Sequence, residues 1–299
     1  MAPSDARVDA RSDAPGVEAA SGRRCLTLAY DGADFAGWQV QPDRPTVQGA
    51  VEHALSEVTG EAIRVQGAGR TDAGVHALGQ VCHFDEPRGL GAERLFGALS
   101  ALLPGAVRPV GLARVPQEFH ALHSAWLKTY VYQLHLSGVR GGKRAVERSV
   151  PPLRRRTHHS VRDDLDLPAM RQAAAALVGT HDFTALSKAM PAGRTTIKTV
   201  RHVRLLRIPR GLAIVVTGEG FLYGMVRLMA ALLVDVGQGR RTVADVPRLL
   251  AGRDRAAAPA LLPAHGLVLG RVHYRPDPRR RDPRRPDPWG GVLGGRLLS

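Results

Sequence analysis

The chain has 299 residues, a hydrophobic fraction of 44% and a formal net charge of +15 at pH 7. This length favours one large domain or two ordinary ones, and the apolar content is near the globular norm, which allows a sizeable core. The strong positive charge makes nucleic acid the first candidate partner, although a proteome biased toward Arg, Ala and Gly would give the same charge. Two cysteines, Cys25 and Cys82, cannot form a disulfide framework and favour a reduced cytoplasm.

Both ends of the chain are predicted to be disordered tails. Residues 1–23 and 276–299 are rich in Pro, Gly, Asp and Arg, and the C-terminal tail is basic. Residues 1–23 have no apolar core and do not resemble a signal peptide. The longest apolar segment, 221–236, is too short to span a bilayer and contains Arg227, so we expect a buried helix and no membrane partner.

Periodic apolar patterns predict the elements of the first half of the chain. The alternating sequence C-L-T-L-A-Y at 25–30 is typical of a strand. The segment 46–60 places its apolar residues on one helical face, and Thr46 can cap its start and Gly60 its end. Two further elements are a short strand at 81–84 and a helix marked by Leu95, Leu99 and Leu102, which Pro104 ends.

The second half of the chain has longer elements and one strongly basic segment. Residues 138–162 carry eight Lys or Arg against one Glu and no hydrophobic period, so we predict an exposed loop that either binds a polyanion or is simply solvated. P-R-G at 209–211 predicts a hairpin turn. The other predicted elements are a strand at 124–136, a helix at 168–178 stopped by Gly179, strands at 196–208 and 212–219, helices at 222–236 and 242–251, and a strand at 266–274.

The order of these elements indicates the fold class. Strands and helices are mixed without strict alternation, which favours the α+β class, with mixed and antiparallel sheets flanked by helices. A boundary near 116–122 would leave two halves of comparable size. We therefore expect an N-terminal domain at 24–118 and a C-terminal domain at 119–275, with a cleft between them.

One motif sets a single carboxylate among glycines. The stretch 67–84 reads G-A-G-R-T-D-A-G-V-H-A-L-G-Q-V-C-H-F, with Asp72 two residues after Arg70. Neighbouring glycines allow close approach of backbone or ligand, so such a turn can aim Asp72 into a cleft. An aspartate that bonds its own turn backbone would show the same pattern. The G-A-G triplet lacks both the dinucleotide fingerprint and the Walker lysine, so it gives little support to a phosphate loop.

Arg227 is the only charged residue in the apolar stretch 221–234. A buried guanidinium needs a carboxylate, a phosphate or a route to water. Asp72 is one candidate partner, and the alternative is that the Arg227 side chain reaches the protein surface.

Aromatic residues accompany a cation on the predicted strand at 124–136. Tyr130 and Tyr132 share a face with Lys128, which can stack bases and hold phosphates, although ordinary sheet packing produces the same pattern. The chain has no zinc-like Cys or His spacing and no H-E-x-x-H motif, so we predict no metal. It also has no G-x-S-x-G motif for a hydrolase triad.

Taken together, these segments resemble the tRNA pseudouridine synthase A family. The resemblance covers roughly residues 24–274, and its longest motif is the stretch 67–81. The other motifs occur in the family's order: Y-D-G-A-D-F-A-G-W-Q at 30–39, T-V-Q at 46–48, L-L-P at 102–104, F-H-A at 119–121, Y-V-Y at 130–132, H-D-F at 181–183, F-L-Y-G-M-V-R at 221–227 and H-G-L-V-L at 265–269.

The resemblance implies an isomerase of the pseudouridine synthase fold that works without a cofactor or metal. It implies conversion of uridine to pseudouridine at positions 38, 39 and 40 of the tRNA anticodon stem-loop, by a cytoplasmic homodimer. It also implies that Asp72 is the catalytic aspartate, Arg227 its partner, Tyr130 the aromatic that stacks on the target base, and Arg70 the arginine that helps to extrude the nucleotide. Because the aspartate must be ionised, we expect the two arginines to lower its pKa.

Some residues depart from the family's usual pattern. Ser100 stands in place of Asn, while Leu122 and Lys128 each stand in place of Arg, and the segment 138–162 replaces a more aromatic stretch. These departures bear on RNA binding and on site preference. The alternatives are a synthase that acts on other RNAs and a non-catalytic tRNA-binding protein or chaperone of the same fold. The presence of Asp72 and Tyr130 argues against the non-catalytic alternative.

Overall fold

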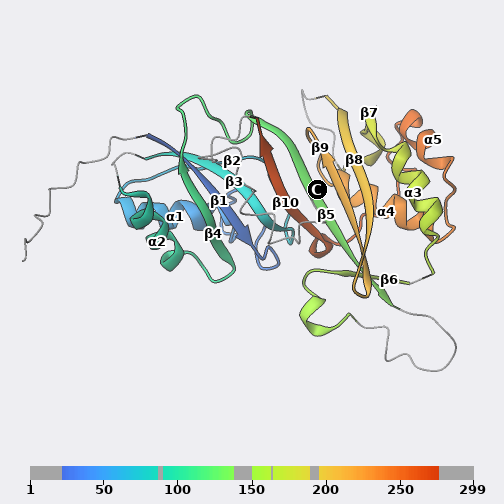
Figure 1. Cartoon of the computed structure of the whole chain (residues 1–299), viewed down its shortest axis with the longest axis horizontal. Coiled ribbons are helices and arrows are strands. Elements are labelled where there is room, and N and C mark those ends of the chain that lie inside the picture. The colour runs from blue at the N-terminus through green and yellow to red at the C-terminus, as the bar shows by residue number, and fades with distance from the viewer. Residues whose placement is uncertain (1–21, 87–89, 138–149, 163, 189–194, 276–299) are drawn as a thin grey trace, which may run out of the picture.

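The computed structural model of the chain describes residues 22–86, 90–137, 150–162, 164–188 and 195–275 (Figure 1). The strands are β1 (Gly22–Tyr30), β2 (Gln66–Gly67), β3 (His76–Glu86), β4 (Val107–Arg114), β5 (Ala125–Ser137), β6 (His159–Arg162), β7 (Gly179–Asp182), β8 (Ile197–Ile208), β9 (Gly211–Gly218) and β10 (Leu267–Tyr274). The α-helices are α1 (Val47–Thr59), α2 (Ala92–Leu102), α3 (Leu167–Ala176), α4 (Met225–Gly237) and α5 (Asp245–Gly252).

All the strands join one ten-stranded mixed sheet with the order β4-β1-β3-β10-β5-β9-β8-β7, in which β2 also pairs with β3 and β6 with β5. Strands that precede residue 119 form one half of this sheet, and strands that follow it form the other. The halves meet where β10 runs parallel to β3, at Val268 opposite His76 and Leu269 opposite Ala77. This order agrees with the expected division at 118 and 119, which remains a prediction.

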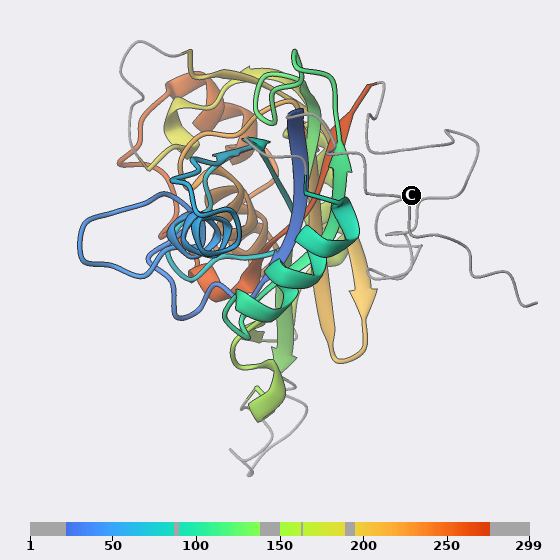
Figure 2. The same ribbon diagram turned by 90° about the vertical axis from the view of Figure 1, so that its left-hand side faces the viewer.

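Helices α1 and α4 lie on the same side of the sheet (Figure 2). Helix α4 is buried along its length except at Arg227 and Asp235. Helix α1 forms as its sequence predicts: the Thr46 hydroxyl accepts a hydrogen bond from the Gly49 backbone N–H, and Gly60 ends the helix at a φ of 73°.

Several elements differ from the sequence predictions, and the short strands β2 and β7 were not predicted at all. Strand β3 is longer than the predicted 81–84, because a central strand is buried on both faces and loses the alternating pattern. Strand β4 was not predicted, because Pro109 and Gly111 interrupt its pattern; it lies at the sheet edge, where proline is tolerated. Residues 22 and 23, which were predicted as part of the N-terminal tail, instead belong to β1, and the Arg23 guanidinium donates to both carboxylate oxygens of Asp85 at 2.8 and 2.9 Å.

The basic segment 138–162 is not a loop throughout, which corrects the prediction for its second part. Residues 150–162 contain a short 3-10 helix and strand β6, which pairs in parallel with β5. The Arg156 guanidinium bonds the carboxylates of Asp31 at 3.0 Å and Asp34 at 2.5 Å, so this segment is tied to the first half of the chain. Residues 138–149, like both predicted tails up to 21 and from 276, lie outside the described residues.

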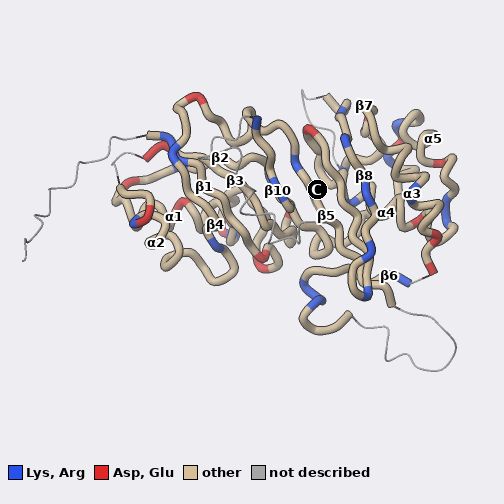
Figure 3. The backbone as a smooth tube through the Cα atoms, in the orientation of Figure 1, with Lys and Arg blue, Asp and Glu red and all other residues tan. Residues whose placement is uncertain are grey.

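Basic positions continue along the second half of the sheet. Figure 3 shows Lys and Arg along β8 and around β6. Strand β8 carries Arg201, Arg204 and Arg207, and the turn after it is the expected hairpin, with Arg210 at a φ of 52°. The surface of the folded body is therefore basic without any contribution from the tails.

Candidate active site

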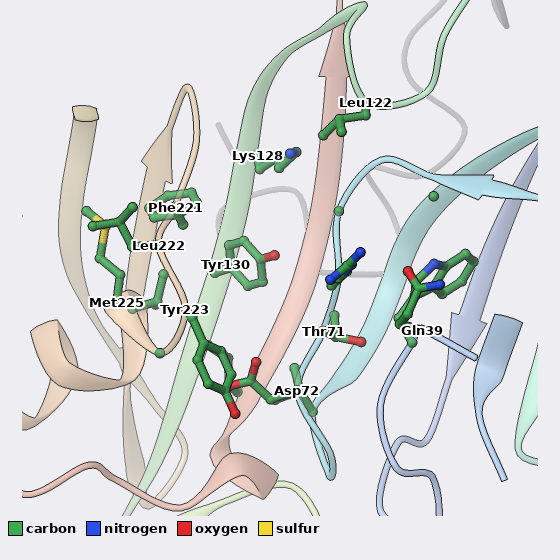
Figure 4. Close-up of a pocket in the computed structure, with 18 of the residues that line it drawn as sticks. Gln39, Thr71, Asp72, Leu122, Lys128, Tyr130, Phe221, Leu222, Tyr223 and Met225 are labelled. Atoms are coloured by element: carbon green, nitrogen blue, oxygen red, sulfur yellow. The ribbon is translucent and has the colours of Figure 1, made fainter. Parts of the chain in front are cut away.

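A cavity of about 1070 Å³ opens between the two halves of the sheet. Asp72 and Arg70 come from the loop between β2 and β3, and Tyr130 and Lys128 come from β5 (Figure 4). The loop that precedes α4 adds Phe221, Leu222 and Tyr223. Residues far apart in the sequence thus share one cavity.

The loop that carries Asp72 is fixed from behind. The Thr71 carbonyl accepts a hydrogen bond from the Trp38 backbone N–H at 3.1 Å, and the Thr71 hydroxyl bonds the Tyr30 hydroxyl at 2.8 Å. Gly37 approaches so closely that a Cβ there would lie 2.7 Å from the Thr71 carbonyl oxygen, and its φ is 102°. Gly37, the second glycine of Y-D-G-A-D-F-A-G-W-Q, therefore packs directly against the loop that carries Asp72.

Two glycines of the stretch 67–84 are explained by the packing and backbone conformation of the chain itself, without any role in the approach of a substrate. A Cβ on Gly67 would lie 2.6 Å from the Trp38 ring, and Gly74 has a φ of 78° in the turn after Asp72. Gly67 and Gly69 both line the cavity, but a Cβ on Gly69 would meet nothing closer than the Lys128 Nζ at 3.4 Å. Among these three glycines, only Gly69 therefore lacks a packing reason of its own and fits the idea that glycine leaves room for a nucleotide.

Arg227 forms an ion pair with Asp72. The Arg227 Nη1 lies 3.1 Å from the Asp72 Oδ2, and the two side chains are 12% and 18% exposed. The Arg227 Nε also donates to the Leu262 carbonyl oxygen at 2.7 Å, which fixes the guanidinium in orientation. The geometry thus selects the carboxylate partner over the route to the surface.

The electrostatics of Asp72 differ from the sequence prediction. Burial raises the pKa of the Asp72 carboxyl above its ordinary value, and the charges of Arg227 and Lys188 lower it only in part. Arg70 is exposed and forms no ion pair or hydrogen bond within the described part of the chain. Arg227 thus lowers this pKa as expected, but Arg70 does not act on it, and burial outweighs the effect of Arg227. The net direction is opposite to the prediction, because the spacing of residues does not reveal desolvation.

Tyr130 presents a buried aromatic ring to the cavity. Its side chain is 8% exposed, and the ring packs edge-on against Phe221 with centroids 5.3 Å apart. Burial raises the pKa of the Tyr130 hydroxyl well above its usual value, so the phenol is neutral. Tyr132, on the same strand, instead donates its hydroxyl to the Pro263 carbonyl oxygen and does not line the cavity.

Several residues near the cavity were not among the predicted site residues. Lys188 donates from Nζ to the Tyr223 hydroxyl at 3.2 Å, and its charge acts on Asp72. Tyr223 lies within the F-L-Y-G-M-V-R motif and could have been found there, whereas no pattern distinguishes Lys188. The described side chains that line the cavity include a single carboxylate, Asp72, and four cations: Arg44, Arg70, Lys128 and Lys198.

The described residues contain no group of three or more His, Cys, Asp or Glu that could hold a metal ion. None of their helices is long and apolar enough to cross a bilayer.

The mixed sheet and the basic cavity with one carboxylate and a buried tyrosine are the features that the resemblance to pseudouridine synthases leads us to expect, and comparison with known families assigns the class. The model of the tRNA pseudouridine synthase family matches residues 27–121 and 173–275. The chain belongs to this family. The unmatched stretch 122–172 contains Tyr130 and the basic segment 138–162.

Curated relatives agree with this assignment. The "tRNA pseudouridine synthase A" of Halalkalibacterium halodurans is 40% identical over 247 residues, which are 82% of this chain and 90% of the relative. The protein of the same name from Shouchella clausii is 40% identical over 84% of this chain and 93% of the relative. That of Brevibacillus brevis is 41% identical over 84% of this chain and 98% of the relative.

Proposed function

We propose that this protein converts uridine to pseudouridine at positions 38, 39 and 40 of the tRNA anticodon stem-loop. The observation that carries the proposal is the single carboxylate of the basic cavity, Asp72, paired with Arg227 and close to the ring of Tyr130. In this reaction the bond between N1 and C1′ breaks, the uracil turns, and a bond forms between C5 and C1′. The proton lost from C5 is balanced by one gained at N1, so the reaction is an isomerisation and consumes no cofactor.

We assign Asp72 as the catalytic carboxylate. It acts in its ionised form, whether it attacks the sugar, attacks the base or removes a sugar proton. The Arg227 guanidinium supports the ionised form at a distance of 3.1 Å and holds the carboxylate in one orientation.

We assign Tyr130 and Arg70 to the handling of the extruded nucleotide. A uridine inside a stacked stem must leave the stack, which costs a few kcal/mol. Stacking on the Tyr130 ring offsets part of this cost. Arg70 is exposed beside the cavity, so its side chain can enter the space that the uridine leaves.

The cellular location and the oligomeric state are parts of the same proposal. We propose a homodimer in which one subunit holds the tRNA body while the other supplies Asp72, because a two-fold pair would join two basic surfaces. A cytoplasmic location fits the two cysteines, which are both buried and not part of a disulfide.

Mapping pseudouridine in unmodified tRNA after incubation with the protein tests the activity. We expect pseudouridine at positions 38, 39 and 40 with the wild-type chain and none with Asp72→Asn. Binding of tRNA without turnover by the wild-type chain would favour a non-catalytic tRNA-binding protein, and pseudouridine only at other sites would favour a different RNA substrate.

A mixture of two inactive variants tests the dimer. One carries Asp72→Ala, and the other carries charge reversals at Arg154, Arg155 and Arg162 that abolish tRNA binding. Heterodimers should regain activity if the carboxylate and the tRNA-binding surface come from different subunits. A monomer in sedimentation at working concentration would refute the assembly.

A further inference from the structure

Lys128 differs from the other cations of the cavity in its burial. Its side chain is 9% exposed, whereas Arg44 and Arg70 are exposed and Lys198 is half-buried. In Figure 4, Lys128 and Asp72 lie on opposite sides of Tyr130. The ammonium group is therefore a deep feature of the cavity wall rather than part of the outer surface.

The Lys128 ammonium has no counter-charge of its own. Within the described ranges of the chain, no Asp or Glu forms an ion pair with Lys128, and no hydrogen bond to its Nζ is formed. Burial and the neighbouring charge of Lys198 lower its pKa to about 8. A buried charge without a partner costs the folded protein stability, so this arrangement favours the entry of an anion.

The surroundings of Lys128 also bring other cations near. A Cβ on Gly69 would lie 3.4 Å from the Lys128 Nζ, so the ammonium lies against the backbone next to Arg70. The charge of Lys198 acts on it from β8, which β9 separates from β5 in the sheet. Lys128 thus lies near a second cation, Lys198, and next to the backbone that carries Arg70. A backbone phosphate is the anion that RNA would bring to such a group, since compact ammonium charges bind phosphates well.

We propose that Lys128 binds a backbone phosphate of the RNA next to the extruded uridine. The proposal rests on the proposed function, because it requires RNA in the cavity. The two sides of Tyr130 then have separate tasks: Asp72 acts on the nucleoside, and Lys128 holds the chain that carries it. Lys128 is a positioning residue in this assignment and does not take part in bond breaking.

The test uses anticodon stem-loop RNAs in which a neutral methylphosphonate replaces the phosphate on the 5′ or the 3′ side of the target uridine. Affinities are measured in the Asp72→Asn background, so that turnover does not interfere. For the chain with Lys128, one of the two replacements should weaken binding about tenfold, as expected for loss of a charge-assisted hydrogen bond.

Lys128→Met should weaken binding of the unmodified RNA to a similar degree and show no further loss with that methylphosphonate. Lys128→Arg should keep the sensitivity to the methylphosphonate. Arg201→Met is the matched control: Arg201 is an exposed cation on β8 that pairs with Glu219, and its loss should leave the full methylphosphonate effect. Lys128→Met should also melt at the same or a higher temperature, because a buried unpaired charge has been removed.

The proposal is overturned if Lys128→Met remains as sensitive to both methylphosphonates as the parent chain, or if the parent is sensitive to neither. A protein that shows the coupling but forms no pseudouridine would contradict the proposed function and leave the phosphate contact standing. The two failures can therefore be told apart.

Discussion

Removal of the Arg227 charge should shift the pH dependence of the reaction. The Arg227 Nη1 and the Asp72 Oδ2 are 3.1 Å apart, which corresponds to roughly 5 kcal/mol of attraction at an effective dielectric constant of about 20. Partial exposure reduces this value, and an adjacent arginine typically lowers a carboxyl pKa by about 1–3 units. Arg227→Met should therefore raise the pKa of Asp72 further, on top of the increase that burial already causes.

Single-turnover rates of pseudouridine formation between pH 5 and 9 provide the measurement. The rate should rise with pH as Asp72 ionises, and in Arg227→Met this rise should move to higher pH. Arg227→Lys should move it less, because the charge remains. The control is Arg253→Met, which removes a partner of Asp182 at the same 3.1 Å separation but outside the cavity, and should cause no shift. A uniformly slower reaction with an unmoved pH profile would show that Arg227 acts only by holding the carboxylate in place.

Three other perturbations have defined outcomes. Asp72→Asn should keep tRNA affinity and abolish turnover, as binding and mapping assays would show; appreciable turnover would refute the assignment. Binding of tRNA should weaken steeply with salt, and a chain that ends at residue 275 should keep most of that slope in filter-binding assays, because the folded body carries the basic surface. Gly37→Ala should lower the free energy of unfolding by about 1–3 kcal/mol in urea titrations, since its φ of 102° and the 2.7 Å approach to Thr71 exclude a Cβ. Gly97→Ala, with open space in helix α2, is the control and should stabilise the protein by about 0.5–1 kcal/mol; equal effects of the two changes would contradict this reading.

Much of the site could be predicted from the sequence because its constraints are local or costly. A lone arginine in an apolar helix needs either a partner or a route to water, and this reasoning made Asp72 one candidate partner of Arg227. The direction of the Asp72 pKa could not be predicted, because it depends on how closely residues from elsewhere cover the carboxyl. Lys188 also gave no signal, since nothing near it in the sequence indicates that its charge acts on Asp72.

The elements of the fold also divide into those that the sequence predicts and those that it does not. Helix α1 follows from its caps and its apolar face, whereas strand β4 depends on an edge position that only the complete sheet defines. The join of β10 to β3 is likewise invisible in the sequence, although it brings the halves of the cavity together. Asp72 and Arg227 are separated by 155 positions along the chain, so their ion pair forms only when the two halves have packed.

Burial in the cavity disfavours the charged forms of both Asp72 and Lys128. Because the pKa of Asp72 is raised, its ionisation reduces the stability of the folded state as the pH rises from the unfolded pKa through the folded one. Because the pKa of Lys128 is lowered to about 8, its charge reduces stability at any pH below that value. At neutral pH the empty cavity therefore holds a charged lysine at a cost, and Arg227 offsets only part of the cost at Asp72. A bound RNA phosphate would relieve the cost at Lys128, so the proposed contact would make part of the binding free energy come from removing an unfavourable charge in the free protein.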